Sequence, residues 1–470
     1  MHKQNTKENM QTSEPDWVVP LRTGNGPRYL QIVRMIENAV ETGNLQPGDQ
    51  IPTQRALAQR LEVDLTTVTR AYARAREQGL VSATTGRGSF IATQPLHAES
   101  SFTDLGMNVP PTPSWLHTSL NQGIEQLLRA QGMRNLSLYE PAALQAQLLQ
   151  AGRQWLEPAL PQLVQRQPLL LAAGTQTALC AILLSRCQRG EAVLCDSLTY
   201  PGFMLAARSL GLRLVPVAGD AQGMRPDALD EAQRASGARL LYLNPTLHNP
   251  STLTMDARRR QEIAALLEQR QLTLIEDDPY RSLLPDAPPP LTEYTQGRRS
   301  FYLASLSKSV WPGLRCSFVL APDQASADDV QDCLRATGMG ASPLLAGLAA
   351  QWIASGQALR IAHEVQRESQ LRQALARELL PKEAQAHSHG LHVWLPLPAH
   401  WPQQVFSHAL QERGVGVATA QAFASAAHSP DAVRISLGAA DSLAQLRPAL
   451  EHIAALWNAG QARGSRRPVV

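Results

Sequence analysis

One lysine lies among hydroxyl groups and ahead of an arginine in the run Ser305-Leu306-Ser307-Lys308-Ser309-Val310-Trp311-Pro312-Gly313-Leu314-Arg315. A lysine amine can form a Schiff base with an aldehyde such as that of pyridoxal phosphate. The hydroxyls of Ser305 and Ser307 and the guanidinium of Arg315 suit a bound phosphate group. The run therefore predicts that Lys308 holds pyridoxal 5'-phosphate.

Two earlier segments carry side chains for the phosphate and the ring of such a cofactor. Thr175 and Gln176 follow Gly174 where a turn of small residues opens an apolar helix, and helix N–H groups can bind a phosphate. Tyr200 lies in a turn after an apolar run, where its ring could stack on a flat cofactor. Taken alone, the first segment could be a simple helix start and the tyrosine a core residue.

Three further polar residues lie in turns that follow apolar runs. Asn249, within residues 242–251, could donate a hydrogen bond to a phenolate oxygen, although turn asparagines are common. Asp277 follows the run Leu272-Thr273-Leu274-Ile275 and could pair with a protonated pyridine nitrogen. Tyr280, three residues later, could bind the same phenolate oxygen. The alternative is that the three acidic residues at 276–278 are only solvated or cap a helix.

One arginine, Arg434, interrupts the apolar run Val433-Arg434-Ile435-Ser436-Leu437. A buried guanidinium is costly unless it is paired. Its partner would be the carboxylate of a substrate or effector, or else an internal Asp or Glu.

Size and composition describe an ordinary globular protein. The chain has 470 residues, enough for two or three domains, with 44% hydrophobic and 18% charged residues. The net charge of +3 excludes a histone-like polycation. The five cysteines show no metal-ligand spacing, so we expect reduced thiols, no metal and a cytoplasmic location. No apolar run reaches the roughly 18–20 residues that span a bilayer, and the polar residues 1–17 predict a disordered lead without a signal peptide.

Residues 26–92 predict three helices followed by a hairpin. The first helix starts after Pro27, and Thr53 can cap the second, over residues 54–61. Asp64 or Thr66 can cap the third. Two short strands, over residues 80–83 and 89–92, follow it. The pattern predicts a winged helix-turn-helix whose third helix enters the major groove, and the alternative is a basic helix in a small helical domain.

The rest of the chain predicts an α/β domain. Residues 94–103 read as a polar linker between a DNA-binding domain over 18–93 and a domain over 104–470. Helical segments alternate with strand-like runs at residues 192–195, 214–217, 240–243, 272–275 and 301–303. This rhythm is typical of a mixed or parallel sheet covered on both faces, here over about 104–340, with a smaller α+β part over about 341–458.

Several motifs in the N-terminal part occur together: Gly43…Leu45-x-Pro47-Gly48-x-x-Ile51-Pro52-x-x-Arg55-x-Leu57-Ala58, Thr67-Val68-x-Arg70-Ala71-Tyr72, Gly79-Leu80 and Gly86-Arg87-Gly88-Ser89-Phe90-Ile91. In them the sequence resembles the GntR family of bacterial regulators. The resemblance implies a set of DNA contacts, namely Arg55, Thr66, Thr67, Thr69, Arg70 and Arg87. It also implies that Tyr72, Val68 and Leu57 pack the small core.

The cofactor segments together resemble fold-type I pyridoxal-phosphate enzymes of the aspartate aminotransferase class, over about residues 104–455. Joined to the GntR-like part, the arrangement looks like the MocR group of regulators. The resemblance implies that Lys308 forms the Schiff base, Asp277 pairs with the ring nitrogen and Tyr200 stacks on the ring. The other implied cofactor contacts are Asn249 and Tyr280 on the ring oxygen, and Ser305, Ser307, Arg315, Thr175 and Gln176 on the phosphate.

The same resemblance implies a homodimer with two DNA-binding heads. Tyr139 would reach the phosphate of the neighbouring subunit, and Arg434 would bind the α-carboxylate of an amino-acid effector. Three loops depart from the usual pattern, at Glu140-Pro141, at Ser251-Thr252 and at Cys316-Ser317. These departures weaken a prediction of efficient transamination more than one of cofactor binding.

We therefore expect a transcription regulator that binds operator DNA and pyridoxal phosphate. An amine or amino acid, or the cofactor itself, would be the effector that changes the DNA affinity. The alternative is an active aminotransferase with an accessory DNA-binding module. A third hypothesis, a domain without cofactor that only dimerises the DNA reader, fits the retained site residues poorly.

Overall fold

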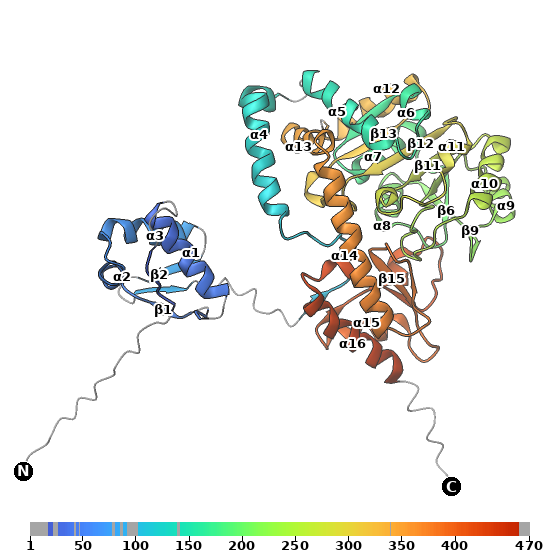
Figure 1. Cartoon of the computed structure of the whole chain (residues 1–470). Coiled ribbons are helices and arrows are strands. Elements are labelled where there is room, and N and C mark those ends of the chain that lie inside the picture. The colour runs from blue at the N-terminus through green and yellow to red at the C-terminus, as the bar shows by residue number, and fades with distance from the viewer. Residues whose placement is uncertain are drawn as a thin grey trace, which may run out of the picture. The chain divides into compact units, whose positions relative to one another are not determined.

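A computed structural model describes residues 17–21, 27–41, 44–46, 48–77, 80–84, 88–91, 102–138, 142–338 and 340–459. The chain divides into two compact units, Met1–Ser101 and Phe102–Val470 (Figure 1). Several predicted features lie outside the described residues, namely the lead over 1–16, most of the linker, Arg87 and Tyr139. Trp17, which we placed in the lead, is buried in the core of the first unit.

The first unit is a small three-helix domain with a three-stranded antiparallel sheet. Its helices are α1 (Arg28–Glu41), α2 (Gln54–Arg60) and α3 (Leu65–Glu77), and its strands are β1 (Gln50–Ile51), β2 (Val81–Thr84) and β3 (Gly88–Ile91), in the order β1-β3-β2. Thr53 caps α2 by accepting from the Ala56 N–H at 3.2 Å, and Asp64 accepts from the Thr66 N–H at 2.7 Å. The three predicted helices and the hairpin are confirmed.

The core of this unit is built where the helices meet. Leu57, Val68 and Tyr72 are buried, as the GntR resemblance implied, and they pack with Ile32 and Ile36 of α1. The Tyr72 hydroxyl donates to the Pro52 carbonyl at 2.7 Å, so its polar end is satisfied inside the core.

The second unit contains a seven-stranded mixed sheet. Its strands are β5 (Leu169–Ala172), β6 (Ala192–Asp196), β7 (Arg213–Val217), β10 (Leu240–Leu243), β11 (Thr273–Asp277), β12 (Ser300–Ser305) and β13 (Ser317–Leu320), in the order β5-β13-β12-β11-β10-β6-β7. Only β13 runs antiparallel to its neighbours, β12 and β5. The sequence predicted the other five strands and missed β5 and β13, because short buried runs without alternation are hard to distinguish from helix.

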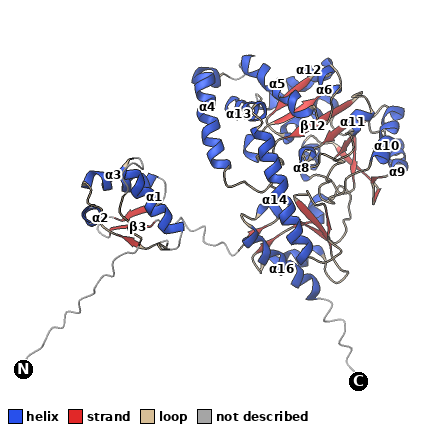
Figure 2. Cartoon of the chain, in the orientation of Figure 1, coloured by secondary structure: helices blue, strands red, loops and turns tan. Residues whose placement is uncertain are grey.

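Helices cover both faces of this sheet, as Figure 2 shows. One face packs against α7 (Thr175–Arg186), α8 (Pro201–Ser209) and α12 (Gln324–Gly338). The other face packs against α5 (Ala142–Leu156), α13 (Pro343–Ala354), α14 (Gln357–Leu379), α9 (Pro226–Ser236) and α10 (Ala257–Arg270). The remaining helices of this part are α4 (Leu116–Leu136), α6 (Leu163–Arg166) and α11 (Leu291–Tyr294). The predicted α/β architecture with both faces covered is confirmed.

The C-terminal part carries a second, smaller sheet. Its strands are β14 (Gln385–Ala386), β15 (His392–Pro396), β17 (Ala418–Thr419) and β18 (Ala432–Ser436), packed with helices α15 (Gln403–Gln411) and α16 (Leu443–Ala459). Beside it, β4 (Thr103–Asp104) pairs in parallel with β16 (Val415–Gly416), so the start of the second unit lies against its C-terminal part. Two short strands, β8 (Gly219–Asp220) and β9 (Gly223–Met224), form a hairpin. Among the described helices, none has the length and apolar character that crossing a bilayer requires.

Candidate functional site

The predicted cofactor residues lie at one edge of the large sheet. Asp277 ends β11, Asn249 follows β10, and Lys308 lies three residues beyond β12. Because β10, β11 and β12 are parallel neighbours, their carboxyl ends meet at the same edge, where α/β sheets bind ligands. The fold therefore brings together residues that are far apart in the sequence.

Asp277 is a buried carboxylate with one oxygen left open. Its Oδ2 atom accepts from the Tyr242 hydroxyl at 2.8 Å, and its main-chain oxygen accepts from the Asn244 amide at 2.7 Å. Oδ1 has no hydrogen-bond partner among the described residues. Burial raises the pKa of Asp277 to about 7. A held carboxylate with one unused oxygen fits a cationic N–H of a bound ring.

Lys308 lies at the same site and forms no ion pair with a carboxylate among the described residues. Its Nζ atom donates to the main-chain oxygen of Asn108. Burial, with the positive charge of Arg434 as a second cause, lowers the pKa of Lys308 to about 8. A lysine with a lowered pKa exposes a neutral, nucleophilic amine to an aldehyde more readily.

Asn249 and Tyr280 each accept a hydrogen bond through a side-chain oxygen, which leaves a donor group on each side chain. The Arg434 guanidinium donates to Asn249 Oδ1 at 2.8 Å, so the amide nitrogen of Asn249 points to the opposite side. The Tyr280 hydroxyl accepts from the Asn108 amide at 2.9 Å, which leaves its own hydrogen free to donate. These two groups fit the ring-oxygen role that the sequence suggested.

The predicted phosphate residues come from three adjacent strands. Gly174 has φ of 95° and caps α7, and a Cβ atom there would lie 3.1 Å from the Arg315 guanidinium. Thr175, the first residue of α7, contacts the Ser317 hydroxyl at 3.1 Å. The Ser305 hydroxyl accepts from the Ser307 N–H at 3.1 Å. A helix N-terminus, hydroxyls and a guanidinium gathered in this way form a phosphate-binding set.

The turn around Tyr200 completes one side of the site. Tyr200 precedes α8, and a Cβ atom at Gly202 would lie 2.4 Å from both the Tyr200 ring and the Gln176 amide oxygen. Glycine is therefore needed for the close approach of these two side chains. Gln176 donates to the Gly202 carbonyl at 2.8 Å, so it shapes this turn. Burial and the charge of Asp277 raise the pKa of Tyr200, which is consistent with a ring beside the carboxylate.

Arg434 on β18 is a buried cation without an internal carboxylate. It is 5% exposed, bonds to Asn249 and to the Gly106 carbonyl, and lies 4.8 Å above the Phe423 ring. No ion pair joins it to any described Asp or Glu, and its Nε atom has no partner. Burial lowers the pKa of Arg434 to about 10. Of the two alternatives from the sequence, the geometry favours a ligand carboxylate.

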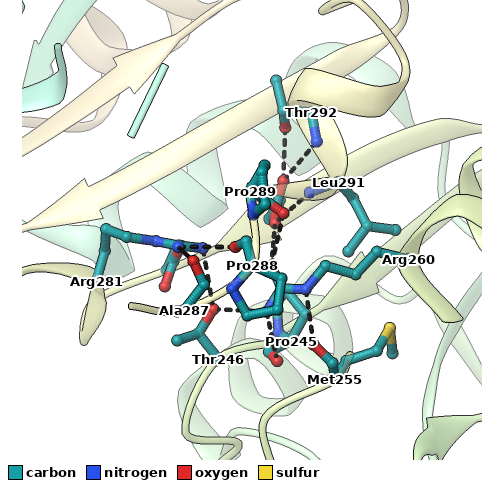
Figure 3. A network of polar contacts seen from close by, with 12 residues as sticks. Pro245, Thr246, Met255, Arg260, Arg281, Ala287, Pro288, Pro289, Leu291 and Thr292 are labelled. Carbon is teal, nitrogen blue, oxygen red and sulfur yellow. Dashed lines mark hydrogen bonds and ion pairs between the residues drawn. The ribbon is translucent and has the colours of Figure 1, made fainter. Parts of the chain in front are cut away.

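A polar network built around two arginines lies next to the site (Figure 3). Arg260 is fully buried and donates to the carbonyls of Pro245, Met255 and Pro289. Arg260 and Arg281 both donate to the Thr246 hydroxyl, at 3.0 and 3.3 Å. The network joins the loop that carries Asn249 to the loop that carries Tyr280, so it fixes the relative position of both.

Sequence reasoning missed four residues of the site, namely Asn108, Tyr242, Asn244 and His392. Asn244 Oδ1 accepts from the Asn249 N–H at 2.9 Å, and the repeated Asn-Pro pairs could have indicated it. Asn108 and His392 lie in segments without a motif, so nothing in the sequence distinguished them.

The predicted DNA contacts lie mostly on the surface of the first unit. Arg55, Thr66 and Thr69 are exposed, and Thr67 is half-buried. Arg70 is exposed, but its guanidinium lies 4.2 Å above the Tyr29 ring of α1. Thr69 donates to Gln54 at 2.9 Å and thereby joins α3 to α2.

Comparison with known families agrees with both units. Residues 100–453 match the family described as aminotransferase class I and II. The chain belongs to this family. Residues 28–91 match the bacterial regulatory proteins of the gntR family, so the first unit is a GntR-type helix-turn-helix domain.

Relatives match along both units, and a solved structure matches the second unit. The chain is 29% identical to the uncharacterized HTH-type transcriptional regulator YdeF of Bacillus subtilis, over 92% of this chain and 95% of that protein. It is 27% identical to the vitamin B6 salvage pathway transcriptional repressor PtsJ of Salmonella typhimurium, over 88% and 95%. The crystal structure of a multiple substrate aminotransferase from Thermococcus profundus superimposes with a TM-score of 0.70 at 19% identity, covering 77% and 93%. This last likeness shows the fold of the second unit.

Proposed function

We propose that the protein is a pyridoxal-phosphate-dependent, DNA-binding transcription regulator whose operator affinity responds to a small amine or amino acid. One observation carries the proposal. The same chain holds a GntR-type helix-turn-helix domain and a site in which the buried Asp277 and Arg434 and the half-buried Lys308 make no ion pair with any described residue. Buried charges normally have partners, so unpartnered ones indicate a ligand. The relatives YdeF and PtsJ, named as transcription regulators, support this over an enzyme with an accessory module.

In this proposal each residue has a defined task. Asp277 would bind the ring nitrogen, Asn249 and Tyr280 the ring oxygen, and Tyr200 one face of the ring. The phosphate would be held by Thr175, Gln176, Ser305, Ser307 and Arg315. The bound cofactor would supply an aldehyde that captures primary amines. Lys308 would hold that cofactor and release it to an incoming amine.

Arg434 favours an amino acid over a simple amine as the effector. Its guanidinium is buried beside Asn249, and a ligand carboxylate could replace the main-chain carbonyl that it bonds to. The cofactor itself remains a second effector, since the name of PtsJ links that relative to vitamin B6 salvage. We further propose a homodimer that reads two half-sites and acts in the cytoplasm on genomic DNA.

The test is to select operator duplexes from a random library with full-chain protein loaded with pyridoxal phosphate. We expect a sequence-selective site whose affinity changes when a mixture of the twenty amino acids is added. Lys308→Ala should bind the same DNA without responding to the mixture. If no sequence is selected, the regulator proposal is wrong.

Transamination is the second candidate, because Lys308, Asp277 and Arg434 keep an arrangement that it needs. The same protein incubated with an amino acid and a 2-oxo acid tests it by product analysis. Rapid turnover together with failure to select DNA would replace the first proposal with this one.

A further inference from the structure

Residues 102–108, which we call the tether segment, begin the second unit directly after the connection to the DNA-binding unit. Thr103 and Leu105 donate main-chain hydrogen bonds to Gly414 and Gly416 at 2.6 and 2.8 Å, and Leu105 accepts one from Ser436 at 2.9 Å. The Leu105 side chain is fully buried in the C-terminal core. The first half of the segment is therefore anchored to the smaller sheet.

The second half of the tether segment reaches the two cations of the ligand site. The Asn108 carbonyl accepts from Lys308 Nζ, and the Gly106 carbonyl accepts from the Arg434 guanidinium. Neither cation has a carboxylate partner among the described residues. A neutral carbonyl is a weaker partner for a buried cation than a carboxylate is.

The side chain of Asn108 adds a third connection. It is 6% exposed, and its amide nitrogen lies 2.9 Å from the Tyr280 hydroxyl and 3.2 Å from His392 Nδ1. This hydrogen bond to Tyr280 opposes the effect of burial, which raises the pKa of that hydroxyl. Asn108 therefore positions Tyr280 and joins the tether segment to β15.

We propose that the tether segment is the ligand-sensing element of this protein. The cofactor competes with the Asn108 carbonyl for Lys308, and an effector carboxylate competes with the Gly106 carbonyl for Arg434. A carboxylate on Arg434 removes the Gly106 contact whether or not the amine of the effector releases Lys308 from the cofactor, and this part of the segment then keeps only its side-chain and sheet contacts. This segment continues into the connection to the DNA-binding unit. When its hydrogen bonds to Lys308 and Arg434 are lost, the restraint that it places on the DNA-binding unit therefore changes. The inference rests on the proposed function and names the regulation of the same site.

Hydrogen–deuterium exchange on full-chain protein loaded with pyridoxal phosphate tests the proposal. The probes are L-alanine, which has an amine and a carboxylate, ethylamine, which has the amine alone, and propionate, which has the carboxylate alone. We expect L-alanine to speed exchange in the peptide over residues 102–110 by about fivefold, the factor that corresponds to losing one net hydrogen bond. Propionate should also speed exchange, because its carboxylate displaces the Gly106 carbonyl from Arg434, whereas ethylamine should not, because it leaves Arg434 bound to Gly106 and frees Lys308.

Two variants and one control separate a sensing role of the tether segment from a purely structural role. Arg434→Gln should abolish the difference between L-alanine and ethylamine. Asn108→Ala should show fast exchange before any ligand is added and should shift the pH midpoint of the cofactor absorption band, because Tyr280 loses a donor. Asn135→Ala, at an exposed position on α4, should behave like the wild type.

The outcomes distinguish this inference from the proposed function. If the cofactor band is absent, the proposed function fails before the inference is reached. If the band is present and shifts with L-alanine while exchange over residues 102–110 stays unchanged, the tether proposal is wrong and the regulator proposal stands. Equal effects of L-alanine and ethylamine would also overturn the role given to Arg434 and Gly106.

Discussion

Three consecutive acidic residues, Glu276, Asp277 and Asp278, are all buried, yet they lie in two different settings. Glu276 accepts hydrogen bonds from Leu291 and Thr292 and lies 3.8 Å from Arg260. Asp278 accepts from Arg281 at 2.8 Å. Asp277, between them, has no ion pair among the described residues, and like Asp278 it keeps one oxygen unused. The paired acids hold loops together, whereas the unpaired acid is available to a ligand.

The arginines divide in the same way. Arg260 and Arg281 are surrounded by carbonyls, a threonine hydroxyl and carboxylates of the protein (Figure 3). Arg434 bonds to one carbonyl and one amide oxygen, and no described carboxylate pairs with it. Burial alone therefore does not identify a binding residue. The useful sign is a buried charge whose opposite charge is missing.

The largest expected effect of a substitution is that of Asp277→Asn on the affinity for pyridoxal phosphate. We expect the dissociation constant for pyridoxal phosphate to rise about 100-fold, because a buried charge pair with the ring nitrogen is lost, worth about 3 kcal/mol. Equilibrium dialysis with absorption detection measures it, with Asp286→Asn at an exposed position as the control. A variant that binds the cofactor normally but unfolds easily would show that Asp277 is structural.

Glu276→Gln should have the opposite signature. It leaves Arg260 fully buried without its carboxylate, so we expect a loss of about 3 kcal/mol in the free energy of unfolding. Urea unfolding of the cofactor-free protein measures this loss. The matched control is Glu125→Gln in an exposed i,i+4 pair with Arg129, where we expect a change below about 0.5 kcal/mol. Equal losses of unfolding free energy in the two variants would contradict the distinction between the buried Glu276–Arg260 pair and the exposed Glu125–Arg129 pair.

The pH dependence of stability should sharpen the comparison further. Asp277 has a folded pKa of about 7, above its ordinary value of 3.8, so it favours the folded state at low pH. That contribution is lost as the pH rises toward 7, and Asp277→Asn lacks it. From about pH 5 to about pH 7 we expect the cofactor-free variant to gain about 2 kcal/mol in the free energy of unfolding relative to the wild type.

Urea unfolding at several pH values checks this prediction. The pKa of Lys308 is lowered from 10.5 to about 8, so its ionisation changes the free energy of unfolding between about pH 8 and pH 10.5. It therefore does not affect the comparison between about pH 5 and about pH 7. A difference between wild type and variant that does not vary with pH would contradict the raised pKa of Asp277.

The smallest effect should be at the DNA-binding surface. Arg55 is exposed and has no ion pair among the described residues, so Arg55→Ala should weaken binding to a selected operator by roughly fivefold to tenfold, about 1 kcal/mol. The slope of log affinity against log salt should fall by about one unit, since one phosphate contact is lost. Fluorescence anisotropy at several salt concentrations measures both quantities. Arg129→Ala, on α4 of the other unit, should leave both unchanged.

The sequence predicted the fold class and the site segments because each carries a local motif. Lys308, Asp277 and Arg434 could be named from their neighbours alone, and the helix caps Thr53 and Asp64 from their types and positions. Strands β5 and β13 were missed because a run of only four mostly apolar residues is too short to show the period of a strand or of a helix. The contacts of Asn108 and Gly106 could not be predicted, since they depend on the pairing of β4 with β16, more than 300 residues apart in the chain.

The most direct measurement is the absorption spectrum of full-chain protein purified with pyridoxal phosphate, beside Lys308→Ala and Lys382→Ala. Lys382 is exposed and is the only other lysine among the described residues. We predict a band near the visible edge in the wild type and in Lys382→Ala, and its loss in Lys308→Ala. No band in the wild type, or a band that survives in Lys308→Ala, would contradict a cofactor held at Lys308.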